Sequence, residues 1–213
     1  MRKVLMSGLI CLWACALRAE PVQIVALGDS LTQGYGLVPE QGFVPQLQVW
    51  LDAQGVDAVV INAGVSGDTT AGGAARVDWA LTPEVDAMIV TLGGNDLLRG
   101  LDPSEAHRNL TVILEAAGNA GIPVLLIGMD APGNFGPDYK LAFDAIYPDL
   151  SAQFGTLYAE DFFAGLGVET PAQARGLMQP DGIHPNAEGV ARIVEALGPQ
   201  VAELAELAED RGS

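Results

Sequence analysis

The chain has 213 residues, of which 49% are hydrophobic and 17% are charged. At roughly 100–200 residues per domain this length predicts one domain, and the apolar content excludes a mainly disordered chain. Only 10 Lys and Arg stand against 27 Asp and Glu, a net charge of −17, which argues against a nucleic-acid partner because basic side chains must neutralise the phosphates.

The first 19 residues have the pattern of a secretory signal peptide. Two basic residues precede an apolar run over residues 4–17, and small residues follow it. This run is short for a hydrocarbon core about 30 Å thick. We expect cleavage after Ala19, with Ala16 as the alternative site, and a single domain over residues 20–213. The expected location is periplasmic or secreted, without stable membrane insertion after cleavage; a retained membrane anchor is the alternative.

Cleavage would change the charge and the available chemistry. It would remove three basic residues and no acidic one (Arg2, Lys3 and Arg18), which leaves 7 basic and 27 acidic residues and a net charge of −20. Both cysteines, Cys11 and Cys15, would also be lost, which excludes disulfides, a cysteine nucleophile and a cysteine-ligated metal. Two histidines remain, too few for most zinc sites. We expect no metal and no other cofactor.

Short apolar runs alternate with longer helical patterns along the rest of the chain. The expected strands are 23–27, 57–62, 87–92, 123–128 and 156–158, and the expected helices are 43–54, 70–79, 104–120, 137–154 and 186–209. The strands are continuous apolar runs, as expected for strands covered on both faces. The alternation predicts an α/β protein with an open parallel sheet and helices on both faces.

The first strand leads into a candidate nucleophile. In such sheets functional residues gather beyond the carboxyl ends of the strands, and this strand is followed by Gly28-Asp29-Ser30-Leu31. Ser30 falls at the first turn of a following helix, where unpaired N–H groups favour negative charge, so it is suited to attack a carbonyl. A plain helix N-cap at Asp29 or Ser30 is the alternative.

Two further strand ends offer hydrogen-bond donors. The second strand is followed by Ser66-Gly67-Asp68, where Gly67 allows a backbone N–H to approach a ligand closely. The third is followed by Gly93-Gly94-Asn95-Asp96, where Asn95 can aim a side-chain amide at the same point. Each segment taken alone also fits an ordinary turn or cap.

A candidate acid–base pair lies near the C-terminus, in Pro180-Asp181-Gly182-Ile183-His184-Pro185. An attacking serine needs a general base, and a neutral histidine needs an orienting carboxylate. Asp181 and His184 are three positions apart in a turn marked by glycine and proline, so one loop can present both. The other histidine, His107, lies in an expected exposed helix without such a setting. We therefore expect His184 to be the base.

Four segments have now been described: Gly28-Asp29-Ser30-Leu31, Gly67-Asp68, Gly93-Gly94-Asn95-Asp96 and Asp181-Gly182-Ile183-His184-Pro185. In this order they resemble the four sequence blocks of the GDSL lipolytic family, the SGNH hydrolases, and the resemblance spans nearly all of the chain after the signal peptide. The resemblance is strongest to the bacterial thioesterase I/lysophospholipase L1/arylesterase branch. It implies a flavodoxin-like three-layer α/β/α sandwich with a five-stranded parallel sheet. It also implies that Ser30 is the nucleophile, that Asp181 and His184 complete the triad, and that Ser30, Gly67 and Asn95 form the oxyanion hole.

Substrate-binding residues are expected in two segments. Leu97, Leu98 and Leu101 follow the third strand and could line an acyl or aryl site, with packing of their own loop as the alternative. Asn134 and Phe135 resemble a substrate-side loop of the same branch.

The expected activity is that of an exported serine esterase acting on aryl or short-chain esters and lysophospholipids through an acyl-enzyme. Acyl thioesters are expected as secondary substrates, because a net charge of −20 repels a polyanionic coenzyme A ester at long range. A carbohydrate O-acetyl esterase on the same fold and a catalytically silent ligand-binding protein are the alternatives. The expected partner is a small-molecule ester or lipid, and the expected state is a monomer.

Overall fold

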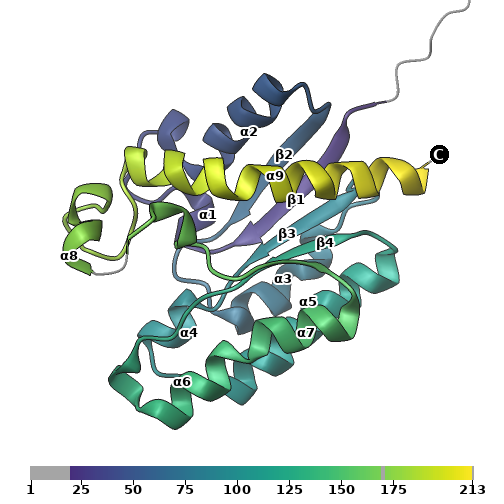
Figure 1. Cartoon of the computed structure of the whole chain (residues 1–213). Helices are drawn as coiled ribbons and strands as arrows, with labels where there is room; N and C mark the ends of the chain where they lie inside the picture. Colours follow the sequence, from purple (N-terminus) through teal and green to yellow (C-terminus); the bar gives the residue numbers. More distant parts are fainter. Residues whose placement is uncertain (1–19, 169–170, 213) are drawn as a thin grey trace, which may run out of the picture.

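A computed structural model of the chain describes residues 20–168 and 171–212 (Figure 1). The expected signal peptide, residues 1–19, lies outside the described residues. The centre of the fold is a five-stranded sheet in the order β2-β1-β3-β4-β5, with every neighbouring pair parallel. The strands are β1 (Val22–Gly28), β2 (Ala58–Gly64), β3 (Ala87–Thr91), β4 (Val124–Ile127) and β5 (Leu157–Ala159). This is the flavodoxin-like strand order, as expected.

Helices cover both faces of the sheet and complete a three-layer α/β/α sandwich (Figure 1). One layer contains α2 (Phe43–Gln54) and α9 (Ala187–Gly212), and the other contains α3 (Thr70–Ala80), α5 (Pro103–Ala120) and α7 (Ile146–Phe154). Helix α5 shows why these segments are helical: its buried residues recur every three to four positions and form one apolar face. They are Ala106, Leu110, Ile113, Leu114 and Ala117.

The edge strand β2 differs from the expectation that all strands are covered on both faces. Strands β1, β3 and β4 are almost wholly buried, but Val59 and Ile61 of β2 are 39% and 38% exposed. Helix α2 packs on one face of β2, and the alternating burial of the strand shows that its other face is open. That expectation was therefore wrong for β2.

The sequence pattern also predicted one helix where the structure has two. The expected helix over 137–154 is divided into α6 (Pro137–Asp144) and α7, joined at Ala145. Pro148 has no N–H to donate to the carbonyl of Asp144, so a continuous helix would lack that bond; in α7 it occupies the first turn, where none is needed.

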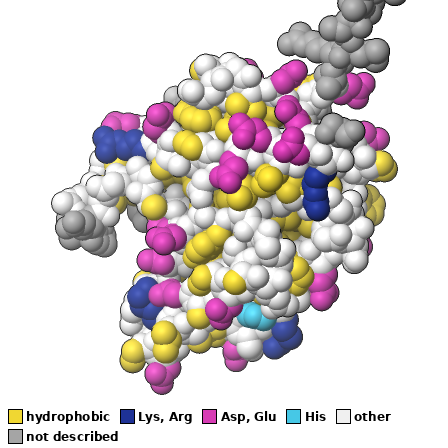
Figure 2. Space-filling view, turned by 45° about the vertical axis from the view of Figure 1, so that its right-hand side comes forward, with side chains coloured by type: hydrophobic (Ala, Val, Ile, Leu, Met, Phe, Trp, Pro, Cys, Tyr) yellow, Lys and Arg dark blue, Asp and Glu magenta, His cyan; other side chains and the backbone are white. Residues whose placement is uncertain are grey.

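Short helical turns complete the chain, and most of them lie beyond the carboxyl ends of the strands. They are α1 (Ser30–Gln33), α4 (Gly94–Leu98), α8 (Pro171–Ala174), and the 3-10 turns η1 (Pro39–Gln41), η2 (Gly133–Phe135), η3 (Ala164–Leu166) and η4 (Arg175–Leu177). On the face that Figure 2 shows, acidic side chains are spread widely and basic ones lie at a few places, in keeping with the net charge of −17.

Candidate active site

The turn between β1 and α1 holds Ser30 at the carboxyl end of a central strand. A side chain at Gly28 would overlap that of Thr32, so only glycine allows the chain to leave the strand this closely. Asp29 is the N-cap of α1, and its Oδ1 accepts a hydrogen bond from the Leu31 N–H at 3.0 Å. The sequence analysis offered two interpretations of this segment, a nucleophile at Ser30 and a plain helix N-cap. Both are compatible with this geometry, because Asp29 caps the helix and Ser30 is its first residue.

A chain of three side chains connects Ser30 to the C-terminal loop. Ser30 Oγ lies 2.8 Å from His184 Nε2, and His184 Nδ1 lies 2.7 Å from Asp181 Oδ2. The other carboxylate oxygen of Asp181 accepts from the N–H groups of Ile183 and His184 at 2.9 and 3.0 Å. The hydrogen bond from His184, followed by those two N–H groups, lowers the pKa of Asp181 to about 2. This carboxylate therefore stays ionised beneath the imidazole.

The loop that carries Asp181 and His184 is closed on itself and tied to a second loop. Met178 and Pro185 form an isolated antiparallel bridge, and the Gln179 N–H donates to the His184 carbonyl at 2.8 Å. The Gln179 side-chain amide donates to the carbonyls of Tyr35 and Pro185 at 2.8 and 3.0 Å. The Tyr35 ring lies against the imidazole, with centroids 4.7 Å apart. Sequence reasoning missed Gln179 and Tyr35, since neither carries a motif signal of its own.

The two loops with the expected oxyanion donors are connected to each other. Gly67 has a φ of +86°, and its carbonyl accepts from Arg99 Nη2 at 2.7 Å. Asp96, buried at the start of α4, accepts from the N–H and the hydroxyl of Thr70 at 2.8 and 2.7 Å. These contacts hold the beginning of α3 against α4, and α4 carries Asn95.

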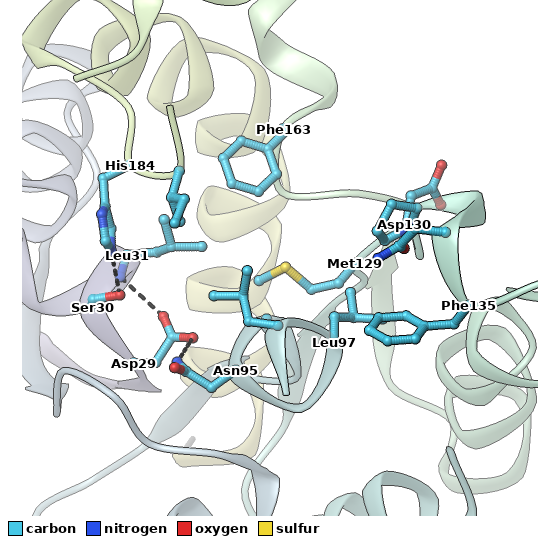
Figure 3. A pocket seen from close by; sticks show the side chains of 15 residues that line it. Asp29, Ser30, Leu31, Asn95, Leu97, Met129, Asp130, Phe135, Phe163 and His184 are labelled. Atoms are coloured by element: carbon cyan, nitrogen blue, oxygen red, sulfur yellow. Dashed lines mark hydrogen bonds between the residues drawn. The ribbon is translucent and has the colours of Figure 1, made fainter. Parts of the chain in front are cut away.

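A cavity of about 250 Å³ opens beside Ser30 and His184 (Figure 3). Figure 3 shows these two residues at one end and Phe135 and Asp130 at the other. Its lining is mostly apolar and consists of Asp29, Ser30, Leu31, Gly94, Asn95, Leu97, Leu98, Met129, Asp130, Pro132, Asn134, Phe135, Phe163, Ile183 and His184. Of the expected substrate-binding residues, Leu97, Leu98, Asn134 and Phe135 therefore line this cavity.

Leu101 is not among the residues that line it. Helix α4 ends at Leu98, and the chain then turns at Gly100, which has a φ of +60°. The Leu101 N–H bonds back to the Asp96 carbonyl, and the Leu101 side chain is exposed. Sequence reasoning in turn missed Met129 and Phe163, which arrive from loops after β4 and β5 that carry no functional motif.

Within residues 20–168 and 171–212, no group of three or more His, Cys, Asp or Glu side chains is placed to hold a metal ion. Over the same ranges, no helix has the length and apolar character needed to cross a membrane.

Most of the sequence matches a known protein family. The match is to the GDSL-like lipase/acylhydrolase family, over residues 26–192. Esterase TesA of Pseudomonas aeruginosa is 38% identical over 96% of this chain and 100% of its own length. An arylesterase of Vibrio mimicus is 32% identical over 90% of this chain and 92% of its own. Thioesterase 1/protease 1/lysophospholipase L1 of Escherichia coli K12 is 33% identical over 85% of this chain and 84% of its own length.

A solved structure shares the same architecture. The crystal structure of AlinE4, described as an SGNH-hydrolase family esterase, superposes with a TM-score of 0.72 at 43% identity. The superposition covers 87% of this chain and 97% of that one.

Proposed function

The chain belongs to the GDSL-like lipase/acylhydrolase family and is a carboxylic ester hydrolase, and we propose that Ser30 is its nucleophile, His184 its general base and Asp181 the residue that orients the base. The observation that carries the proposal is the continuous hydrogen-bond chain from Asp181 through His184 to Ser30, at 2.7 and 2.8 Å. Two members of this hydrogen-bonded set, Ser30 and His184, line the apolar cavity.

The reaction proceeds in two halves with the same groups. Ser30 Oγ attacks the acyl carbon while His184 Nε2 takes its proton, and the ionised Asp181 stabilises the imidazolium. His184 then returns the proton to the leaving alcohol or thiol as the tetrahedral intermediate collapses to an acyl-serine. Water attacks this ester with His184 again as the base, and the carboxylic acid and free Ser30 are released.

The oxyanion of each tetrahedral intermediate is held by the N–H groups of Ser30 and Gly67 and by the Asn95 amide. Fixed donors of this kind act where charge develops, so they stabilise the transition state more than the bound ester. The links from Arg99 to the Gly67 carbonyl and from Asp96 to Thr70 support this role, because they keep the two loops in fixed relation.

The cavity favours aryl and short acyl groups. A protein cavity of about 150 Å³ lined by apolar side chains can hold benzene, and the one beside Ser30 has about 250 Å³. From this cavity we propose aryl and short-chain esters as substrates. We propose lysophospholipids as well, on the likeness to thioesterase 1/protease 1/lysophospholipase L1. Acyl-coenzyme A esters would be poorer substrates, because the chain without residues 1–19, with 7 basic and 27 acidic residues and a net charge of −20, repels a polyanion. We propose that the enzyme is exported, to the periplasm or beyond it, as the pattern of residues 1–19 indicates. We also propose that it acts as a monomer.

Ser30→Ala is the test of the mechanism. We expect it to abolish hydrolysis of p-nitrophenyl esters and labelling by a serine-directed phosphonate, with the folded structure retained by circular dichroism. His107→Ala, on the outer helix α5, is the matched control and should keep both. Ester hydrolysis at the wild-type rate by Ser30→Ala would contradict the assignment, and faster hydrolysis of acetylated sugars than of aryl esters would favour a carbohydrate O-acetyl esterase.

A further inference from the structure

Asp29 is a buried carboxylate that the proposed mechanism does not use. It immediately precedes Ser30, is 2% exposed and contributes to the lining of the cavity. Its two oxygens have separate partners: Oδ1 accepts from the Leu31 N–H at 3.0 Å and Oδ2 accepts from Asn95 Nδ2 at 3.0 Å (Figure 3). A helix cap needs only the first of these contacts, so the second one requires an explanation.

The second contact determines which end of the Asn95 amide points where. A side-chain amide has a donor end and an acceptor end of nearly equal shape, and its neighbours select between them. A carboxylate offers only acceptors, so it attracts the NH₂ group of Asn95 and repels the amide oxygen. One N–H of Asn95 is then used by Asp29, and its second N–H is left for another acceptor. If the amide were turned over, its oxygen would lie close to the Asp29 carboxylate.

Burying the Asp29 carboxylate is unfavourable, and its hydrogen bonds offset that free energy. Burial raises the pKa of Asp29, while the hydrogen bonds from Leu31 and Asn95 counteract that effect. A buried carboxylate is expensive unless its oxygens are hydrogen-bonded, and here each oxygen has its own N–H donor.

We infer that Asp29 is the positioning residue of the oxyanion hole: its Oδ2 holds the Asn95 amide with the NH₂ group toward the reacting carbonyl, while its Oδ1 caps α1. The inference rests on the proposed function, since it concerns the Asn95 donor of that mechanism. Asp29 itself does not touch the reacting atoms; it acts through Asn95.

Asp29→Ser separates the two contacts. A serine at an N-cap position retains the helix cap, but its single oxygen cannot also serve Asn95. We expect kcat for p-nitrophenyl butyrate to fall about 10- to 100-fold, somewhat less than the 10²–10³-fold loss when an oxyanion donor is removed outright. KM and the midpoint of thermal unfolding should change little. Asp29→Asn, which has one acceptor and one donor in place of two acceptors, should lower kcat similarly and provides a second variant should Asp29→Ser not fold.

A double-mutant cycle gives the readout that a structural role would not produce. If Asp29 acts through Asn95, then Asp29→Ser should change kcat by less than about twofold in an Asn95→Ala background, because coupled residues are not additive. Asp102→Ser is the matched control: Asp102 caps α5 through the Ser104 N–H at 2.9 Å and has no contact with Asn95, so kcat should stay at the wild-type value.

Three results would overturn the inference. The first is wild-type kcat in both Asp29 variants, and the second is equal losses of kcat on the wild-type and Asn95→Ala backgrounds. The third is a kcat loss in Asp102→Ser as large as in Asp29→Ser, which would make the effect one of helix capping. All assays include Ser30→Ala. An active Ser30→Ala would refute the proposed function itself, whereas an inactive one together with any of the three results refutes only the role of Asp29.

Discussion

Arg76 Nη2 donates to the carbonyl oxygen of Gly28 at 2.8 Å, so a side chain from the helix after β2 fixes the last residue of β1. Its Nη1 donates to the Ala63 carbonyl in β2 at 2.8 Å, and its Nε pairs with Asp68 Oδ2 at 2.7 Å. The Arg76 side chain is 24% exposed. One guanidinium thus joins the ends of two strands to the loop that contains Gly67.

Replacement of Arg76 by Met should destabilise the protein and impair catalysis. It leaves two carbonyls and a half-buried carboxylate without their charged donor, and hydrogen bonds to charged groups contribute about 1.5–3 kcal/mol each at most. We expect the free energy of unfolding in urea to fall by about 2–4 kcal/mol. Arg192→Met breaks an exposed pair with Glu188 and should cost less than about 0.5 kcal/mol. Equal losses in the two variants would contradict this account.

The depressed pKa of Asp181 predicts how stability depends on pH. Its pKa falls from 3.8 to about 2 in the folded chain, so the unfolded chain binds this proton more tightly. The resulting stabilisation is fully present above pH about 4 and is lost as the pH falls through about 2. The stability advantage of wild type over Asp181→Asn should therefore shrink as the pH falls from about 4 to about 2.5 in urea titrations. It should be small, because the carboxylate is partly exposed. An advantage that does not vary with pH would contradict the prediction.

Phe163 should limit the length of the acyl chain. It lines the cavity beside Ser30 and also an adjoining open cleft that includes Leu166 and Met178. Phe163→Ala should join the two spaces and raise kcat/KM for 12-carbon relative to 4-carbon p-nitrophenyl esters. The gain should be up to about 0.8 kcal/mol, or about fourfold, for each further methylene that is buried. Leu101→Ala, outside this cavity, is the control and should leave the ratio unchanged. An unchanged ratio in Phe163→Ala would place the acyl chain elsewhere.

Two helix glycines should respond in opposite ways to alanine. A Cβ at Gly118 of α5 would meet open space, so Gly118→Ala should raise the unfolding free energy by about 0.4–1 kcal/mol. A Cβ at Gly198 of α9 would lie 2.6 Å from the Trp50 ring. Overpacking of about 1–3 kcal/mol should then exceed the gain in helix propensity. Thermal unfolding of both variants measures the difference, and a stabilised Gly198→Ala would show that Trp50 moves aside freely.

Much of the fold could be predicted because its signals are local. The ends of the five expected strands agree with the structure within two residues, since apolar runs bounded by glycine, proline and polar residues mark buried parallel strands. The break at Ala145 was missed because the apolar pattern continues through it, although Pro148 carried the signal. The open face of β2 was missed because strand order depends on long-range pairing, and the runs of the edge strand and the central strands look alike.

The site residues that belong to a sequence motif could be predicted. Those that reach the site only through the packing of distant loops could not. Ser30, Asp181 and His184 were singled out by residue type and spacing, and the structure brings their side chains together. Met129 and Phe163 are ordinary apolar residues until the loops after β4 and β5 meet at the cavity. The Asp29–Asn95 contact joins residues 66 positions apart, and nothing in either segment indicates it.

The large separation along the chain between Ser30 and His184, 154 positions, has a consequence for biosynthesis. A nascent chain that has emerged as far as β5 already contains Ser30, Gly67 and Asn95, but on the proposed assignment it lacks a base. It would therefore be inert towards the esters of the cell that makes it. Hydrolysis would begin only when the loop before α9 packs against the end of β1. In a refolding experiment, recovery of activity would therefore report when the last quarter of the polypeptide docks onto the rest of the fold.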